Sequence, residues 1–415
     1  MRRIVVGIVG IVVAAGAVAF WAWPRGEIAP PPTPPGPRLL WSFEAPRPGS
    51  VIAAPLITPD GIYLAAVHAQ GFRVTGAVYA LNPATGKPRW VFDRDGEMLP
   101  TASSPVFAGG RLIFGEGMHA NFSCKLYALD PGTGKQVWAF DTGDHIEGGP
   151  ATDGTTVYFP AGNDGVYAVD VASGRRRWNF REDVHIDSSP AIVNGRAYVG
   201  SGTSRRYKTT QVICLDAATG GPVWRAPVPL PAWSTPLVEG GRVYAGLGNG
   251  RLTEGARPPE VPAGALVCLD AGSGAILWSF PVGDAVFTRP VAANGVVVFG
   301  SRDGHLYGLS EDGRERFRLS TGGPIISSPA IDRGFVYAVT VTGRIVCINI
   351  LTGQEIWRRE LPQPGAVPQV FAPVRVVGDR LFVAAEMQPP GSSIGIVSLL
   401  CFELPPDRGR PEGSR

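Results

Sequence analysis

The sequence predicts an all-β fold, an eight-bladed β-propeller of four-stranded antiparallel blades, from three observations. A segment containing a Thr-Gly turn and a Trp recurs along the chain, and a second segment with a Pro and an apolar run recurs eight times. The last of these units lacks its final strand. Self-similarity at this length indicates an array of supersecondary units, and such units bury both faces only against neighbours arranged around an axis.

The first repeated segment predicts the two outer strands of each blade. It joins an apolar strand to an acidic or amide residue, a Thr-Gly turn and a Trp, as in LYALDPGTGKQVW at 126–138. Glycine suits such turns because it adopts positive φ without strain. Copies end at Trp90, Trp138, Trp178, Trp224, Trp278 and Trp357, and a degenerate copy one residue shorter ends at Phe317.

The second repeated segment predicts the two inner strands. It reads SSPVFAGGRLIFG from Ser103 and SSPAIVNGRAYVG from Ser188, with similar copies in the other units. Alternating Val, Ile, Tyr and Phe around Gly or Asn-Gly are typical of short antiparallel strands joined by tight turns. Each unit therefore supplies four consecutive strands, A to D.

The eighth unit predicts how the ring closes. Its strand C, at 398–404, is not followed by a Thr-Gly-Trp segment. A matching strand, LLWSF at 39–43, stands near the other end of the sequence. We expect this N-terminal strand to complete the last blade, because closure removes the exposed sheet edges.

With these motifs the chain resembles the eight-bladed pyrroloquinoline quinone (PQQ) repeat family, and within it the type of the outer-membrane assembly factor BamB. The resemblance covers residues 39–404. It implies that the motif aromatics dock adjacent blades against each other, and that the junction at Phe317 is looser. These structural docking residues are Trp41, Trp90, Trp138, Trp178, Trp224, Trp278, Phe317 and Trp357.

The same family contains quinoprotein dehydrogenases, which bind PQQ and calcium in the channel and carry adjacent cysteines beside the cofactor. This sequence has no Cys-Cys pair, and no residue matches the family's catalytic Asp. It also has no nucleophile elbow and no phosphate-binding glycine loop. We therefore assign no catalytic or cofactor-binding residue and expect no cofactor, with PQQ and calcium as the alternative.

The N-terminal segment predicts export. Arg2 and Arg3 precede an uncharged apolar stretch at 4–23, long enough to span a bilayer as a helix. Residues 1–23 are thus a membrane anchor or, since Ala17-Val18-Ala19 is an acceptable cleavage site, a signal peptide. A Pro-rich linker at 24–38, the propeller at 39–404 and a flexible tail at 405–415 follow. The propeller is expected outside the cytoplasm, in the periplasm or at the cell surface, and secreted if the N-terminus is cleaved.

Composition argues against a nucleic-acid partner. Charged residues make up 18% of the chain, the net charge is +3, and basic residues are scattered through turns. Four of the five cysteines, Cys214, Cys268, Cys347 and Cys401, occupy a strand C position that elsewhere holds Ala or Gly. They are expected to be buried and unpaired, which leaves Cys124 as the one candidate for a reactive thiol.

One end of the propeller is the predicted working surface. In a four-strand meander the B–C and D–A connections emerge on the same face, and five B–C connections are enlarged. Loops on a rigid face commonly carry recognition. The enlarged connections are 67–75, 116–123, 201–210, 247–263 and 386–398.

Two adjacent blades repeat a His-x-acid pair on this face. His145 with Glu147, and His185 with Asp187, begin five residues before the Pro of their blades. This spacing predicts a candidate site for a divalent metal or an anionic ligand, against the alternative that they are ordinary polar loop residues.

The sequence therefore favours a non-catalytic interaction scaffold in the cell envelope, tethered by an N-terminal helix and binding an envelope or membrane protein. A PQQ- and calcium-dependent dehydrogenase is the first alternative. A sensor domain that captures a small ligand in the channel is the second.

Overall fold

The computed structural model describes residues 36–406, apart from 72, 251–258 and 363–364. Strands dominate this part of the chain, and its one helical element is the 3-10 turn η1 (Arg94–Gly96). Within the same residues, no helix has the length and hydropathy that a membrane crossing requires. The anchor or signal peptide expected at 1–23 lies outside the described residues, as do 24–35 of the linker and 407–415 of the tail.

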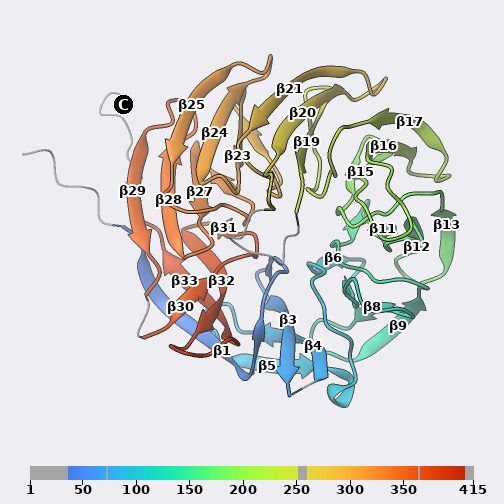
Figure 1. Ribbon diagram of the computed structural model, residues 1–415. Helices are drawn as coiled ribbons and strands as arrows, with labels where there is room; N and C mark the ends of the chain where they lie inside the picture. The colour runs from blue at the N-terminus through green and yellow to red at the C-terminus, as the bar shows by residue number, and fades with distance from the viewer. Residues whose placement is uncertain (1–35, 72, 251–258, 363–364, 407–415) are drawn as a thin grey trace, which may run out of the picture. The chain divides into compact units, whose positions relative to one another are not determined.

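Six of the blades are separate four-stranded antiparallel sheets, which follow one another in chain order (Figure 1). Blade 2 comprises β6 (Val106–Ala108), β7 (Arg111–Gly115), β8 (Lys125–Leu129) and β9 (Gln136–Asp141). Blade 3 comprises β10 (Ala151–Thr152), β11 (Thr156–Pro160), β12 (Val166–Asp170) and β13 (Arg176–Phe180). Blade 4 comprises β14 (Ala191–Val193), β15 (Arg196–Gly200), β16 (Gln211–Asp216) and β17 (Pro222–Pro227). Blade 5 comprises β18 (Leu237–Glu239), β19 (Arg242–Gly248), β20 (Gly264–Asp270) and β21 (Ile276–Val282). Blade 6 comprises β22 (Val291–Ala293), β23 (Val296–Gly300), β24 (His305–Ser310) and β25 (Glu315–Ser320). Blade 7 comprises β26 (Ala330–Asp332), β27 (Phe335–Val339), β28 (Arg344–Asn349) and β29 (Glu355–Glu360).

The remaining two blades share one nine-stranded sheet. Blade 1 comprises β2 (Leu56–Ile57), β3 (Ile62–Gln70), β4 (Arg73–Leu81) and β5 (Pro88–Phe92). Blade 8 comprises β31 (Arg375–Val377), β32 (Arg380–Gln388), β33 (Ile396–Glu403) and β1 (Arg38–Ser50), and β30 (Val367–Gln369) pairs with the end of β32. The described strands thus form the eight four-stranded blades that the repeat predicted, and the all-β fold class is confirmed.

The N-terminal strand completes the last blade, as predicted. Strand β1 runs antiparallel to β33, with Trp41 opposite Cys401 and Phe43 opposite Leu399. The ion pair between Arg38 Nη2 and Glu403 Oε2, 2.6 Å long, lies at the start of this pairing. The two ends of the described chain therefore belong to one sheet.

Strand β1 is longer than the predicted 39–43 and also pairs with β3. After a register shift between Glu44 and Pro48, Gly49 lies opposite His68 in the first blade. A Cβ added at Gly49 would lie 1.9 Å from the Val67 carbonyl oxygen, so only glycine permits this approach. This second pairing joins blade 8 to blade 1 through backbone hydrogen bonds as well as side-chain packing.

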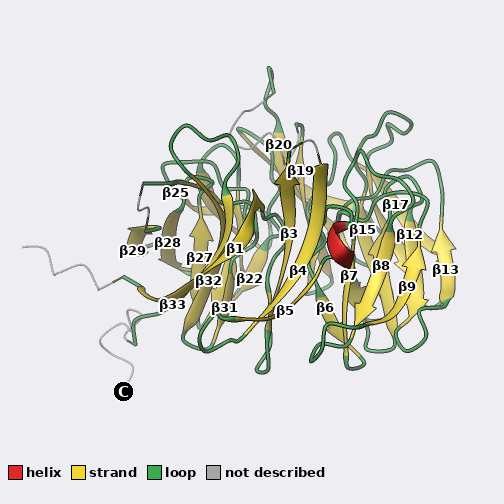
Figure 2. Cartoon of the chain, turned by 90° about the horizontal axis from the view of Figure 1, so that it is seen from below, coloured by secondary structure: helices red, strands yellow, loops and turns green. Residues whose placement is uncertain are grey.

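Buried hydrophobic clusters lie between neighbouring blades all the way around the ring. Eight such clusters each draw residues from two consecutive blades, including one that joins Phe382 and Leu399 of blade 8 to Ile62 and Tyr79 of blade 1. Burial of apolar area is the main stabilising contribution in such sheet packing. The connections between strands extend from the two ends of the blades, as Figure 2 shows.

Most of the motif tryptophans lie against the glycine of the C–D turn of the following blade. A Cβ at Gly174 of blade 3 would lie 2.7 Å from Cδ2 of Trp138 in blade 2. Trp138 Nε1 also donates a 3.0 Å hydrogen bond to the Val171 carbonyl of that turn. The same ring-on-glycine contact joins Trp41 to Gly86, Trp90 to Gly134, Trp178 to Gly220, Trp224 to Gly274, Trp278 to Gly313 and Phe317 to Gly353.

Three of the docking positions, Trp41, Phe317 and Trp357, depart from this pattern. Phe317 has no ring N–H, so its junction lacks the hydrogen bond to the turn. Trp357 packs into the hydrophobic cluster between blades 7 and 8. It meets no C–D turn there, because the fourth strand of blade 8 is β1 from the other end of the described chain. The Nε1 atoms of Trp41 and Trp357 are buried without a hydrogen-bond partner in the described structure.

All five cysteines are buried and free of disulfides. Cys214, Cys268, Cys347 and Cys401 lie on the third strand of their blades, as predicted. The expectation that Cys124 is reactive is wrong, because its side chain is fully buried beside Gly117 and burial raises its pKa to about 12. A thiol with so high a pKa is almost entirely un-ionised at neutral pH and reacts slowly.

Candidate functional site

The candidate site lies where the B–C and D–A connections of blades 2, 3 and 4 meet. It contains His119 from the β7–β8 connection, His145 from the β9–β10 connection, and His185 with Asp187 from the β13–β14 connection. One ligand atom from each of these four residues lies within 4.8 Å of every other. We call these four residues the histidine cluster.

The repeat itself aims three of these side chains. In His145-Ile146-Glu147 and His185-Ile186-Asp187 the central isoleucine is fully buried in an inter-blade core. Alternate residues of an extended segment point to opposite sides, so burial of the isoleucine turns its two polar neighbours away from the core.

Neighbouring backbone packs tightly around the cluster. Isolated β-bridges pair Ile186 with Gly162 and His185 with Gly202. Gly162 has φ +49°, and a Cβ there would lie 2.9 Å from His145 Cε1. These contacts hold the D–A segments against the B–C connections and fix the positions of the rings.

Each histidine has a hydrogen-bond partner at Nδ1. His145 Nδ1 lies 2.6 Å from Asp144 Oδ1, and His185 Nδ1 lies 3.1 Å from Asn163 Oδ1. His119 Nδ1 lies 2.7 Å from Glu147 Oε1, which also accepts the His119 backbone N–H. These acceptors favour a proton on Nδ1 of every ring and leave the three Nε2 atoms on the other side.

The three Nε2 atoms converge on the Asp187 carboxylate. The distance to the nearer carboxylate oxygen is 2.8 Å for His185, 3.1 Å for His145 and 3.4 Å for His119. His185 Nε2 and Asp187 Oδ2 are nevertheless buried without a hydrogen-bond partner in the described structure, although they are close. Their separation is that of an ion pair, but their geometry is not that of a hydrogen bond.

The electrostatics of the cluster follow from this packing. Burial opposes protonation of His145, but hydrogen bonds to Asp144 and Asp187 outweigh it and raise its pKa to about 10. The hydrogen bond to Glu147 raises the pKa of His119. Burial alone would raise the pKa of Asp187, but the hydrogen bond from His145 and the adjacent His185 ring hold it well below its usual range. Asp187 therefore carries a negative charge at neutral pH.

Three of the four cluster residues are among the candidates predicted from the sequence, and the remaining candidate, Glu147, is not a member of the cluster. His145, His185 and Asp187 meet, whereas Glu147 faces His119 Nδ1 rather than the centre of the cluster. His119 was not paired with them because it comes from a B–C connection outside the repeat. Its position on the same face, in the enlarged connection of the adjacent blade, was the available signal.

The other two histidines lie elsewhere on this face. His68 is buried in β3, where its Nε2 lies 2.8 Å from the Tyr79 hydroxyl. Burial lowers the pKa of His68. His305 begins β24, and its Nδ1 lies 3.3 Å from Asp303 Oδ1.

An apolar group occupies the corresponding D–A positions of the later blades. Phe287 and Ile326 stand at these positions, and with Val341 of the β27–β28 connection they form a buried cluster. Trp233 and Phe371 pack against this cluster. The Trp233 ring centroid lies 6.5 Å from that of His119. The histidine cluster therefore borders a buried apolar cluster on the side of blades 5 to 8.

Strands extend into three of the predicted enlarged connections. At 386–398 they leave 389–395 between β32 and β33, and at 247–263 residues 247–248 belong to β19. Residues 67–75 are mostly strand rather than loop, because β3 and β4 pair from Ile62↔Leu81 to Gln70↔Arg73. Exposed apolar side chains stand on four of the five predicted connections, at Val74, Phe122, Val261 and Ile394.

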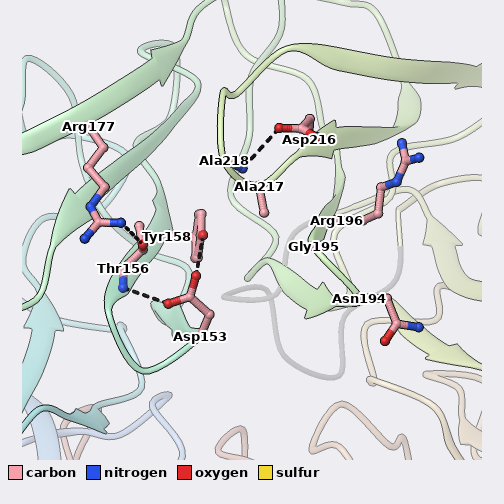
Figure 3. A pocket seen from close by; sticks show the side chains of 10 residues that line it. All are labelled: Asp153, Thr156, Tyr158, Arg177, Asn194, Gly195, Arg196, Asp216, Ala217 and Ala218. Carbon is pink, nitrogen blue, oxygen red and sulfur yellow. Dashed lines mark hydrogen bonds between the residues drawn. The ribbon is translucent and has the colours of Figure 1, made fainter.

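The opposite face carries a cleft of about 480 Å³ between blades 3 and 4 (Figure 3). Its lining includes Asp153, Arg177 and Arg196. Asp153 already accepts hydrogen bonds from the Thr156 backbone and the Tyr158 hydroxyl. Arg177 is likewise engaged, with Thr156 and Asp170. Because Asp153 and Arg177 are already paired with neighbouring groups, we assign no functional site to this cleft.

The sequence matches the profile of a protein family described as outer membrane protein assembly factor BamB. The matched segments are residues 33–139, 122–208, 194–255 and 261–404. Together they include nearly all of the described ring.

A curated relative, the outer membrane protein assembly factor BamB of Yersinia pestis, is 30% identical over 101 residues, which are 23% of this chain and 26% of the relative. The chain spans between a quarter and a third of the length of the curated relatives it matches.

Solved structures share the fold at low identity. The crystal structure of BamB from Moraxella catarrhalis aligns with a TM-score of 0.64 and 16% identity, over 88% of this chain and 97% of that one. A europium-containing methanol dehydrogenase aligns with a TM-score of 0.63 and 13% identity, over 89% and 93%.

Proposed function

We infer that this chain, which belongs to the family described as outer membrane protein assembly factor BamB, is a non-catalytic scaffold of the cell envelope. In this proposal its propeller lies outside the cytoplasm and binds a protein of the outer-membrane assembly machinery. The face that carries the enlarged connections and the histidine cluster is the binding surface.

The observation that supports this surface is its exposed apolar side chains. Phe122, Val261 and Ile394 are 67%, 74% and 41% exposed and stand on three different B–C connections. Large apolar groups displayed on loops gain free energy when a partner covers them, and aromatic residues dominate such contacts.

The ring suits a scaffold because it holds those connections at fixed positions. Every blade is packed against both neighbours, and β1 closes the ring through backbone pairing. A rigid support reduces the conformational entropy lost on binding. Loop residues on such a support are common sites of recognition.

The test is affinity capture from solubilised envelopes with the full chain as bait. The triple variant Phe122→Ser, Val261→Ser, Ile394→Ser is compared with the control Val91→Ser, Val137→Ser, Val223→Ser, whose residues are exposed on the outer strands. We expect outer-membrane assembly proteins with the wild type and the control, and a loss of at least tenfold with the first variant. Equal recovery by both variants would refute the proposed surface.

The quinoprotein alternative rests on the shared fold alone, since the dehydrogenase structure is 13% identical to this chain. A dye-linked alcohol oxidation assay with added PQQ and calcium tests it. The scaffold proposal predicts no oxidation above a bait-free blank, and turnover in this assay would replace it.

A further inference from the structure

We propose that His119, His145, His185 and Asp187 bind a divalent first-row transition-metal ion of the zinc type. This proposal is independent of the scaffold function, because it concerns a set of side chains rather than a partner.

The donor set matches this class of ion. Three imidazole nitrogens and one carboxylate oxygen are ligands that zinc takes in four-coordinate sites, and imidazole also suits copper and nickel. Magnesium and calcium prefer oxygen ligands almost exclusively. The cluster therefore selects against the two hard cations that are commonest in protein sites.

The hydrogen bonds behind the rings are those of a metal centre. A metal-binding histidine normally donates its second ring N–H to a carboxylate or carbonyl, which orients the ring and strengthens the ligand. Asp144, Glu147 and Asn163 provide that acceptor for the three rings in turn. Every Nε2 atom is thereby directed to one point.

Two buried polar atoms at that point are unsatisfied. His185 Nε2 and Asp187 Oδ2 are 2.8 Å apart, and neither has a hydrogen-bond partner in the described structure. A buried polar atom without a partner is costly, and native proteins rarely keep one without a reason. An ion bound between the two atoms would satisfy both.

The dimensions require only a small adjustment. Ligand atoms in a tetrahedral zinc site are about 3.4 Å apart, as follows from zinc–nitrogen bonds of about 2.0–2.1 Å. The ligand atoms of the cluster lie within 4.8 Å of one another, and the Nε2 distances to Asp187 range from 2.8 to 3.4 Å. The His119 pair already has this spacing, and the closer pair of His185 Nε2 and Asp187 Oδ2 would move apart by about 0.6 Å to reach it. The half-exposed His119 side chain (54%) leaves a route for the ion from solvent.

The charges around the cluster favour a cation over an anion, the other ligand that the sequence left open for this site. Three carboxylate side chains, those of Asp144, Glu147 and Asp187, lie against the three rings. When the rings are neutral ligands, the cluster is negative and attracts a cation. The bound ion would then link connections from blades 2, 3 and 4.

The experiment uses the full chain without a polyhistidine tag, purified in mild detergent and stripped with EDTA. Titration calorimetry with Zn²⁺ alone, and elemental analysis after dialysis, measure affinity and stoichiometry. We expect one zinc per chain with a Kd below 1 µM. Cobalt(II) added instead should give the intense visible absorption of a four-coordinate centre.

Variants separate binding at this site from binding elsewhere and from misfolding. His185→Gln and Asp187→Asn should each weaken zinc binding at least 100-fold and abolish the cobalt spectrum. The control His305→Gln, on the same face, should keep wild-type affinity. Circular dichroism and the unfolding midpoint of the EDTA-treated proteins report folding separately. No zinc at equivalence, or unchanged zinc affinity in folded His185→Gln, would overturn the proposal.

Discussion

The indole of Trp41 lies against Gly86 across the ring closure, so closely that a Cβ at Gly86 would be 2.4 Å from Trp41 Cε3. Trp41 belongs to β1, the last strand of blade 8, and Gly86 belongs to the Thr-Gly turn of blade 1. The contact is the same ring-on-glycine arrangement that joins the blades elsewhere. Closure of the ring therefore uses the ring-on-glycine contact of the repeat without its Nε1 hydrogen bond, and the indole comes from the other end of the described chain.

Gly86→Ala tests this contact. Gly86 has φ +69°, so the substitution costs backbone strain of about 1 kcal/mol, and the clash with Trp41 should raise the total loss to about 3 kcal/mol. The matched control is Gly110→Ala, which has φ +73° but meets nothing within 4 Å. Chemical denaturation measures both, and equal losses would show that the Trp41 contact contributes nothing.

Trp138 separates ring packing from hydrogen bonding at a blade junction. Trp138→Phe keeps most of the ring but leaves the Val171 carbonyl without its donor, so we expect a loss of about 1–2 kcal/mol. Trp138→Ala removes the ring and should cost about 3–5 kcal/mol. Free energies of unfolding for the two variants decide the point. Similar losses would mean that the hydrogen bond, and not the ring, holds the junction.

The recurrence of Trp and Thr-Gly made the fold predictable, because each copy shows both where a strand pair ends and what it docks against. The closing role of Trp41 was legible for the same reason. The pairing of β1 with β3 could not be predicted from the sequence, because it depends on the close approach of Gly49 to Val67. No repeated motif indicates that contact. Long-range approaches of this kind are set by the assembled ring.

The sequence predicted only those residues of the candidate site that lie in the repeated segments. His145 and His185 occupy equivalent positions in adjacent blades, and Asp187 follows His185 by two residues. A buried isoleucine between the members of each His-x-acid pair sets the direction of these side chains. The position of His119 depends on the course of a non-repeated connection, and so does the burial of Cys124. In both cases the decisive quantity was loop conformation, which composition and spacing leave open.

Asp153 makes the free energy of unfolding depend on pH, and the direction follows from its pKa. Burial opposes ionisation, but hydrogen bonds from Thr155, Tyr158 and Thr156 outweigh it and lower the pKa of Asp153 to about 2. Since the folded-state pKa is below the unfolded value, the stabilisation is complete above about pH 4 and is lost as pH falls toward 2. Because Asp153 is exposed, solvent screening limits the effect to less than about 1 kcal/mol.

Asp153→Asn should therefore lower the unfolding midpoint at pH 6 and have a smaller effect at pH 2.5. The control Glu239→Gln removes an exposed carboxylate at the end of β18 and should change little at either pH. A difference between Asp153→Asn and wild type that grows on acidification would contradict the assigned sign.

Asp144 tests whether ring orientation matters for metal affinity. Asp144→Asn weakens the acceptor at His145 Nδ1, which lies 2.6 Å from Asp144 Oδ1. Loss of such an outer partner lowers metal affinity about 10- to 100-fold, so we expect a zinc Kd raised by that factor. Calorimetry with zinc measures it, and an unchanged Kd would argue that the hydrogen bond does not orient a ligand.

Site-specific photo-crosslinking in the living cell tests the scaffold account most directly. A photoreactive amino acid replaces Phe122 on the proposed binding face or, as control, Val137 on the outer strand β9. If the face that carries Phe122 binds the partner, position 122 forms crosslinks to a protein of the outer-membrane assembly machinery and position 137 does not. Crosslinks from position 137 alone, or the same products from both positions, would contradict it.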